Sequence, residues 1–114
     1  MKLDFRKLGF KRLDPPYQNY IVYNDGRVWS TYKHAFLVPT KANNEYLVLW
    51  LWANNKPKLW LVHRLVATVF IPNPNGYKVV NHKDGSKYNN HWRNLEWCTQ
   101  KYNLYHAQCH GKNS

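Results

Sequence analysis

Three polar side chains in the C-terminal half of the chain have the types needed to hydrolyse a phosphodiester bond. His82 carries an imidazole, which can take a proton from water near neutral pH. Asn81 and Asn103 offer side-chain carbonyl oxygens, which can hold a hard divalent cation such as Mg²⁺. A cation that keeps several waters can also bind a phosphate and offset charge on a leaving oxygen. Taken alone, each residue is better explained as a packing or turn residue, so the interpretation as a hydrolytic site depends on their combination.

The elements around these residues should bring them together. A β-type run at residues 77–80 predicts a strand that delivers Asn81 and His82, and a loop rich in Gly, Ser, Asn and Lys follows. A second strand is expected over residues 95–98. Thr99 then suits the N-cap of a helix over residues 100–109, because its hydroxyl can accept a hydrogen bond from a free amide one turn on. This compact unit can bring Asn94 close to both the imidazole and the helix.

The same stretch resembles the HNH endonucleases, in the branch found among phage and intron homing enzymes. The family pattern is met in order by Asn81-His82, Asp84-Gly85, Asn89-Asn90, Asn94-Leu95-Glu96-Trp97 and Asn103. Residues 61–72 also resemble the segment that usually precedes this motif, so the resemblance covers residues 61–107. It implies an α+β fold, in which an N-terminal antiparallel β-sheet lobe is followed by a helix and a ββα-metal nuclease motif.

The resemblance also implies a role for each of the four motif residues. His82 is the general base that activates water, and Asn94 braces the loop through backbone hydrogen bonds so that the imidazole is held in position. Asn81 and Asn103 are the metal ligands, with one Mg²⁺ or Mn²⁺ per active site. The implied activity is that of a homing-type DNA endonuclease acting on double-stranded DNA.

The expected ligands depart from the family pattern at two positions. The family often has Asp before the first His, where this chain has Asn81, and it often has His at the third position of the motif, where this chain has Asn103. With no carboxylate among the ligands, the free protein should bind Mg²⁺ weakly, since hard cations favour charged oxygen. The phosphate of bound DNA would then complete the site. Of the nearest carboxylates, we expect Asp84 to serve the Asp-Gly turn and Glu96 to face solvent or a basic neighbour.

The charge of the chain favours a polyanionic partner. Its 114 residues, enough for one domain, carry 17 Lys and Arg against 6 acids and a net charge of +11. Nucleic acid is the default partner for such an excess, although a basic ribosomal or structural protein would carry a similar charge. Aromatic residues make up 17% of the chain, more than so small a core needs. Some should therefore lie on the surface near basic residues, where they can pack against sugars or bases.

Four residues are candidates for DNA contact: Arg27, Trp29, Lys33 and His106. The first three fall on or just after the second strand of a hairpin predicted over residues 19–31, whose turn is Asn24-Asp25-Gly26. The fourth lies on the same face of the last helix as Asn103. Each could equally belong to a plain solvated surface.

The rest of the chain divides into simple segments. We expect a basic arm at residues 1–16, an antiparallel β DNA-binding lobe at 17–62, the nuclease motif with its preceding helix at 63–110, and a tail at 111–114. A second strand pair over residues 45–62 should join the first hairpin in one sheet. The helix should begin at His63, which we interpret as structural, and end before Pro72 and Pro74.

Tyr46, Val48, Trp50 and Trp52 share one face of the second strand pair and need a covering layer, DNA or a partner chain. Because a single site cuts one strand, a homodimer is one option, with Trp50 and Trp52 as its candidate interface.

The two cysteines do not form a disulfide scaffold. Cys98 should belong to the core. A zinc site that joins it to His106, Cys109 and His110 would match no common ligand spacing. No apolar stretch is long enough to span a membrane and no signal peptide is visible, so we expect an intracellular protein, in the host cytoplasm if phage-encoded.

Two other functions remain open. The chain could be a catalytically impaired nucleic-acid-binding protein, because Asn81 is neutral. It could also be a plain basic interaction protein, which would leave the ordered motif as coincidence.

Overall fold

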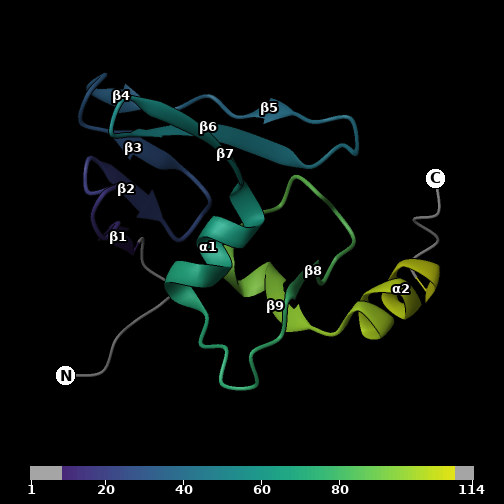
Figure 1. The fold of residues 1–114 in the computed structure, drawn as a ribbon. Coiled ribbons are helices and arrows are strands. Elements are labelled where there is room, and N and C mark those ends of the chain that lie inside the picture. The colour runs from purple at the N-terminus through teal and green to yellow at the C-terminus, as the bar shows by residue number, and fades with distance from the viewer. Residues whose placement is uncertain (1–8, 110–114) are drawn as a thin grey trace.

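The computed structural model describes residues 9–109, with side chains placed as far as residue 106. Its elements are β1 (Phe10–Arg12), β2 (Tyr20–Tyr23), β3 (Val28–Ser30), β4 (Ala35–Phe36), β5 (Thr40–Lys41), β6 (Leu47–Ala53), β7 (Lys56–Leu61), α1 (Val62–Phe70), β8 (Val79–His82), the 3-10 turn η1 (Trp92–Asn94), β9 (Leu95–Cys98) and α2 (Gln100–Cys109). All strand pairs are antiparallel, and α1 lies between the upstream sheets and the β8–β9 pair (Figure 1). The α+β fold class expected from the sequence is confirmed.

The first sheet has the order β1-β2-β3-β4 and contains the predicted hairpin. Alternate residues of β2 and β3 face the core, and the intervening side chains form the outer face. Gly26 in the hairpin turn has a φ of +102°, a conformation that residues with a Cβ rarely adopt. Because β1 is paired with β2, residues 10–12 of the expected basic arm belong to this sheet, whereas residues 1–8 lie outside the described part of the chain.

The strands β5-β6-β7 form a second, separate sheet, where the sequence had suggested one sheet with the first hairpin. After β4 the chain reaches Pro39, which has no N–H to continue the ladder, so β5 pairs with β6 instead. The β6–β7 turn consists of Asn54 and Asn55 with φ values of 53° and 63°, as a two-residue type I′ hairpin requires. The turn is therefore only two residues long, and β6 and β7 pair as far as Ala53 and Lys56.

Helix α1 provides much of the core. Its buried side chains are Val62, His63, Leu65, Val66 and Ala67. They pack with Val22, Leu49, Leu51, Val80 and Leu95, so that all three sheets share one hydrophobic cluster. Full burial of each Leu or Val stabilises the fold by about 1.5–3 kcal/mol. The helix ends where Ile71 N–H bonds the Ala67 carbonyl oxygen, immediately before Pro72.

The C-terminal unit follows the sequence prediction closely. Strand β8 ends at His82. Its direct cross-strand partner is Leu95, the first residue of β9. The N–H of Tyr102 donates to the hydroxyl of Thr99 at 3.1 Å, so Thr99 is the N-cap of α2 as expected. Helix α2 packs against β8 and extends away from the body of the molecule (Figure 1).

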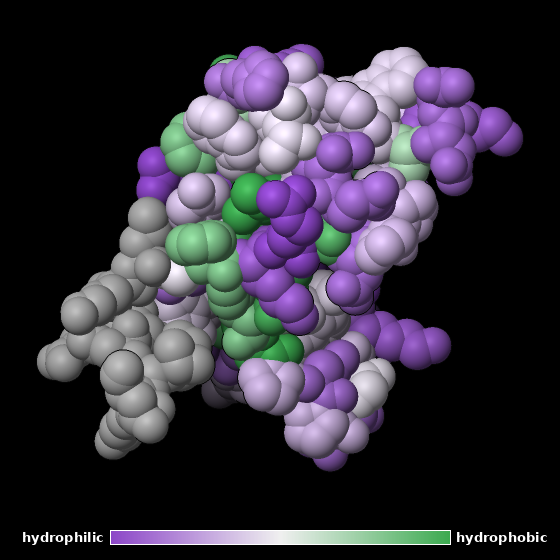
Figure 2. Space-filling model, turned by 90° about the vertical axis from the view of Figure 1, so that its left-hand side faces the viewer, coloured by the Kyte–Doolittle hydropathy of each residue, from purple (hydrophilic) through white to green (hydrophobic). Residues whose placement is uncertain are grey.

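The surface is largely polar. Figure 2 shows one face on which hydrophobic side chains gather mainly in a central band, with a few more near its upper edges, among hydrophilic ones. Neither of the two described helices has the length and apolar character that crossing a bilayer would require.

The turn of the first hairpin contacts the loop that follows β8. The N–H of Trp92 donates to the carbonyl oxygen of Asn24 at 2.8 Å, and Asn24 is itself buried. A methyl group added at Gly26 would lie 3.1 Å from the Cβ of Asn90, which is closer than ordinary van der Waals contact. The N-terminal sheet therefore supports the loop between β8 and β9.

We expect Gly26→Ala to lower the free energy of unfolding by about 2 kcal/mol or more. The added methyl group would be held at an unfavourable φ and would also crowd the side chain of Asn90. Gly76→Ala is the matched control, since its φ is +64° but no atom lies within 4 Å of the added methyl. That control should lose about 1 kcal/mol. Urea unfolding measures both variants, and equal losses would show that the contact with Asn90 is unimportant.

Candidate functional site

His82, the last residue of β8, has an imidazole that is buried and oriented by hydrogen bonding. Its exposed fraction is 5%, and its ring centroid lies 4.9 Å from that of His63 and 5.9 Å from that of Tyr46. Its Nε2 lies 2.7 Å from Oδ1 of Asn90, which is also buried. Because a carbonyl oxygen only accepts, Nε2 carries the hydrogen and Nδ1 keeps its lone pair for another donor.

Both histidines of this ring cluster are held neutral. Burial lowers the pKa of His82, and the opposing effects of the Asn90 hydrogen bond and of Asp84 only partly offset it. Burial also lowers the pKa of His63 to about 3, with a further contribution from His82. The structural interpretation of His63 agrees with its position inside the core.

The loop after β8 is closed by side-chain hydrogen bonds centred on Asn94. Its Oδ1 accepts from the N–H of Asp84 at 3.0 Å, and its Nδ2 donates to the carbonyl oxygen of Asn89 at 2.8 Å. Its own carbonyl oxygen accepts from the N–H of Lys83, directly after the imidazole. These are the backbone bonds by which a loop brace would hold His82 in place.

Asp84 serves the Asp-Gly turn as the sequence suggested. It accepts from the N–H of Ser86 and from the side-chain amides of Asn89 and Asn94, at 2.8–2.9 Å. Burial alone would raise its pKa, but these hydrogen bonds more than offset that effect and hold the pKa below its ordinary value.

Asn81 points to the opposite face of β8 from His82, because consecutive strand residues alternate. Its exposed fraction is 5%, and its Nδ2 donates to Oε2 of Glu96 at 2.8 Å. The two residues are direct cross-strand partners. Glu96 is half-buried and lines an open groove with Lys83 and Arg93, in line with our expectation that it would face solvent or a basic neighbour, and it contacts a candidate ligand in addition.

Helix α2, which packs against β8, carries the fourth motif residue. Asn103 is half-buried, and it lies one turn before His106 on the same helical face. The Nε2 of His106 lies 3.0 Å from the carbonyl oxygen of Lys83, so this imidazole joins α2 to the loop. The helix thus packs against the strand that carries Asn81.

The residues around Asn81 suit a hard cation better than a soft one. Among the described side chains, which end at residue 106, no three from His, Cys, Asp or Glu gather as a metal site. Amide oxygens such as those of Asn81 and Asn103, and carboxylate oxygens such as those of Glu96, are the kinds of donor that Mg²⁺ or Mn²⁺ prefers.

The structure gives no support to a zinc site at the end of α2. The side chain of Cys109 and all of His110 lie outside the described part. Burial raises the pKa of the Cys98 thiol, as the Glu96 carboxylate does to a smaller extent, which disfavours the thiolate that zinc binds. Cys98 is a buried core residue, as expected.

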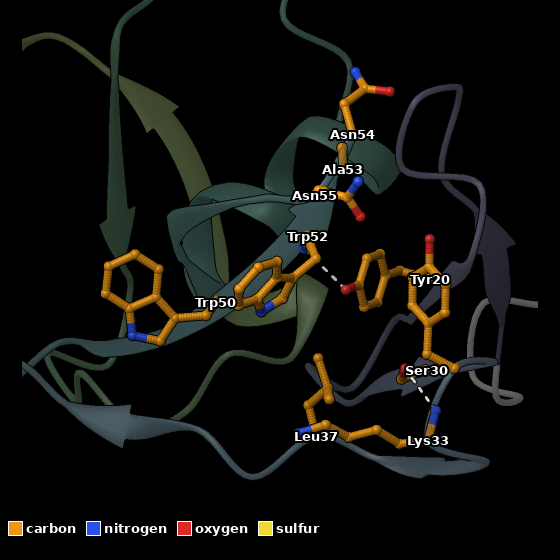
Figure 3. Close-up of a pocket in the computed structure, with 10 residues that line it drawn as sticks. Tyr20, Ser30, Lys33, Leu37, Trp50, Trp52, Ala53, Asn54 and Asn55 are labelled. Atoms are coloured by element: carbon orange, nitrogen blue, oxygen red, sulfur yellow. Dashed lines mark hydrogen bonds between the residues drawn. The ribbon is translucent and has the colours of Figure 1, made fainter.

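The candidate DNA-contact residues of the first sheet fall on two different surfaces. Arg27 bonds Asp25 at 3.0 Å and lies 4.6 Å above the ring of Phe36, against which Trp29 also packs. Lys33 instead lines a pocket of about 350 Å³ at the tip of β6, together with Trp50 and Trp52. Figure 3 shows both indoles beside this pocket, with Leu37 and Lys33 on its other side.

Sequence reasoning missed several residues that support the site. Asn90 was visible only as part of an Asn-Asn pair, with no sign that it would contact the imidazole. The side-chain amine of Lys87 donates to the carbonyl oxygen of Asn44 at 2.9 Å, and the hydroxyl of Tyr88 donates to Glu45. These bonds fasten the β5–β6 turn to the loop, which no local pattern in the sequence indicates.

Comparison with known proteins gives a consistent picture. A sequence profile described as HNH endonuclease matches residues 61–105. The chain is 46% identical over 88 residues to an uncharacterised HNH endonuclease of Acanthamoeba polyphaga mimivirus, a match that covers 77% of this chain and 27% of that protein. It is 38% identical over 93 residues to the DNA endonuclease I-HmuI of Bacillus phage SP01, covering 82% of this chain and 53% of that one.

The fold is also similar to a solved structure, described as DNA binding and cleavage by the HNH homing endonuclease I-HmuI. The TM-score is 0.81 at 35% identity, and the match covers 93% of this chain and 61% of that chain. The chain thus spans only about a quarter to a half of these two curated relatives, 27% and 53% of their lengths.

The low pKa of His63 predicts a pH-dependent stability. Its folded-state value of about 3 lies below the ordinary value of about 6.5, so the unfolded chain binds one more proton between those pH values. The free energy of unfolding should therefore fall as pH drops below about 6.5, by up to about 1.4 kcal/mol per pH unit. Denaturant titrations at several pH values should show a shallower fall in His63→Phe. The exposed His34→Asn control should keep the full slope, and an unchanged slope in His63→Phe would contradict the assignment.

Proposed function

Because this chain belongs to the HNH endonuclease family, we propose that it is a metal-dependent DNA endonuclease that hydrolyses a phosphodiester bond. One observation supports this above the others. The imidazole of His82 stands at the end of β8 with Nε2 bonded to Asn90 at 2.7 Å, so that Nδ1 has its lone pair available. A neutral, oriented imidazole is what a general base for water requires.

In the proposed reaction, Nδ1 of His82 takes a proton from the attacking water. The buried Asn90 carbonyl then stabilises the imidazolium, because it accepts the hydrogen on the other ring nitrogen. Asn94 acts as a positioning residue, since its bonds to the neighbours of His82 fix the loop. Burial lowers the pKa of His82, which favours the neutral form of the imidazole that a base requires.

The alternation of side chains along β8 suits an in-line displacement. Asn81 and His82 point to opposite sides of the strand end, where one contacts Glu96 and the other His63. Hydrolysis of a phosphodiester needs the attacking and leaving oxygens on opposite sides of phosphorus. A phosphate lying across the end of β8 would have the base on one side and the amide ligands on the other.

We propose Asn81 and Asn103 as the ligands of one Mg²⁺ or Mn²⁺ ion. When bound, the ion would neutralise phosphate charge and stabilise the leaving oxygen. Because both ligands are neutral amides, the DNA phosphate would supply the remaining charged oxygen.

The proposed partner is double-stranded DNA. The related I-HmuI is described as binding and cleaving DNA, and this chain carries a net charge of +11. Arg27, Trp29 and Lys33 would contact the duplex through the β lobe. His106 already bonds the Lys83 carbonyl oxygen, so any phosphate contact it makes would use its other ring nitrogen.

A homodimer through the face of β6 is a further option. Trp50 and Trp52 are 55% and 49% exposed, which leaves an apolar surface for a partner. Two copies with a charge of +11 each would repel one another, so this surface favours DNA over a second copy.

The second candidate function is a nucleic-acid-binding protein with impaired catalysis. The neutral Asn81 and the 5% exposure of His82 favour it, because water must reach the imidazole for hydrolysis. A nicking assay on phage DNA with and without Mg²⁺ separates the two functions, and a gain of activity in Asn81→Asp would favour the enzyme.

We expect His82→Ala to lower the rate of DNA cleavage by at least about 100-fold, because a general base is lost. DNA affinity should stay within a few-fold, since the imidazole is buried. The His34→Asn variant is the control, as it removes an exposed histidine. Supercoiled plasmid nicking in Mg²⁺ measures the rate, and circular dichroism checks folding. Cleavage at the original rate in folded His82→Ala would remove this residue from its assigned role.

If the β lobe binds phosphate through Lys33, its removal should weaken binding at every sequence. We expect Lys33→Ala to lower DNA affinity and to reduce the slope of log affinity against log salt by about 1. Lys78→Ala is the matched control, because it makes the same charge change on the segment before β8. Fluorescence anisotropy at several salt concentrations measures both. A slope that changes equally in the two variants would show only the loss of overall charge.

A further inference from the structure

The pair formed by Asn81 and Glu96 is the only direct contact between an expected metal ligand and a carboxylate among the described residues. The two residues are opposite each other in the β8–β9 register, and Nδ2 of Asn81 donates to Oε2 of Glu96 at 2.8 Å. Cross-strand partners lie side by side on the same face of a sheet, so this contact is built into the strand pairing.

The contact selects one orientation of the Asn81 amide. A carboxylate can only accept, so the NH₂ group must face Glu96 and the carbonyl oxygen must point the other way. Among the side chains of residues 9–106, the bond to Glu96 is the only hydrogen bond of the Asn81 amide, which leaves its Oδ1 without a donor. A carbonyl oxygen with free lone pairs, held by a buried side chain, is an oriented ligand for a cation.

Glu96 also brings a negative charge, in a groove that Lys83 and Arg93 line as well. In the described part of the chain, no Lys or Arg forms an ion pair with it. A carboxylate that accepts a hydrogen bond from a ligand makes that ligand a better donor to the metal, and it adds its own attraction for the cation.

We propose that Glu96 is a positioning residue of the metal site. It fixes the amide of Asn81 with its oxygen toward the cation, and it supplies the negative charge that the two amide ligands lack. This inference rests on the proposed function, because it assumes that Asn81 binds a divalent ion.

The test measures Mn²⁺ binding rather than cleavage. The full chain with His82→Ala, in which cleavage is expected to be at least about 100-fold slower, is mixed with a short DNA duplex, and free Mn²⁺ is followed by electron paramagnetic resonance. The duplex alone provides the background. In this setting Glu96→Gln keeps the shape and an acceptor for Asn81 but removes the charge, whereas Glu96→Ala removes both. Asp14→Asn makes the same charge change at an exposed residue between β1 and β2, outside the β8–β9 pair.

We expect Glu96→Gln to weaken Mn²⁺ binding by about 10-fold, as is typical when a residue behind a metal ligand is changed. Glu96→Ala should bind more weakly still, and Asp14→Asn should match the parent. The double variant Asn81→Asp, Glu96→Gln moves the carboxylate onto the ligand position. It should restore the affinity for Mn²⁺ to at least the parent level.

Two outcomes would overturn the inference in different ways. If Glu96→Gln binds Mn²⁺ as tightly as the parent, the charge of Glu96 has no role and only this inference is lost. If the parent complex binds no Mn²⁺ beyond the duplex background, the metal-dependent function fails and this inference fails with it.

Discussion

The bond between Nε2 of His82 and Oδ1 of Asn90 is the interaction on which the site depends. Both groups are buried, so each would lose free energy of about 1–3 kcal/mol if left without a partner. The bond also decides which ring nitrogen holds the hydrogen, and therefore which one faces the substrate. Much of the surrounding structure can be understood as keeping Asn90 in position.

That requirement explains why the β lobe and the nuclease motif share one core. The hairpin turn contacts the loop through Gly26 and Asn24, while Tyr88 and Lys87 fasten the loop to the β5–β6 turn. The motif therefore takes part of its support from strands that precede it by many residues. A lobe proposed to bind DNA would thus also hold the catalytic loop, which would fix the position of the duplex relative to the base.

The sequence predicted the local parts of this arrangement well and the long-range parts poorly. The hairpin at 19–31, the strand β9 and the cap at Thr99 depend on neighbouring residues, so turn chemistry and alternation were sufficient to find them. The separation of the sheets, the contact of Asn90 with His82 and the partner of Glu96 depend on tertiary packing or strand register. A shift of the β8–β9 register by one residue would have placed Glu96 on the other face, and no residue type signals which register forms.

The distribution of charge links metal binding to DNA binding. Asp25, Glu45, Asp84 and Glu96 each accept a hydrogen bond, so carboxylates serve structural contacts in a chain of net charge +11. A cation held by two amides in such a chain has little to attract it until a phosphate arrives. By thermodynamic linkage, DNA would then raise the affinity for the ion by the same factor as the ion raises the affinity for DNA. Because the two proposed ligands are neutral and only one carboxylate lies beside them, the affinity of the site for the cation would depend on the phosphate of the bound duplex.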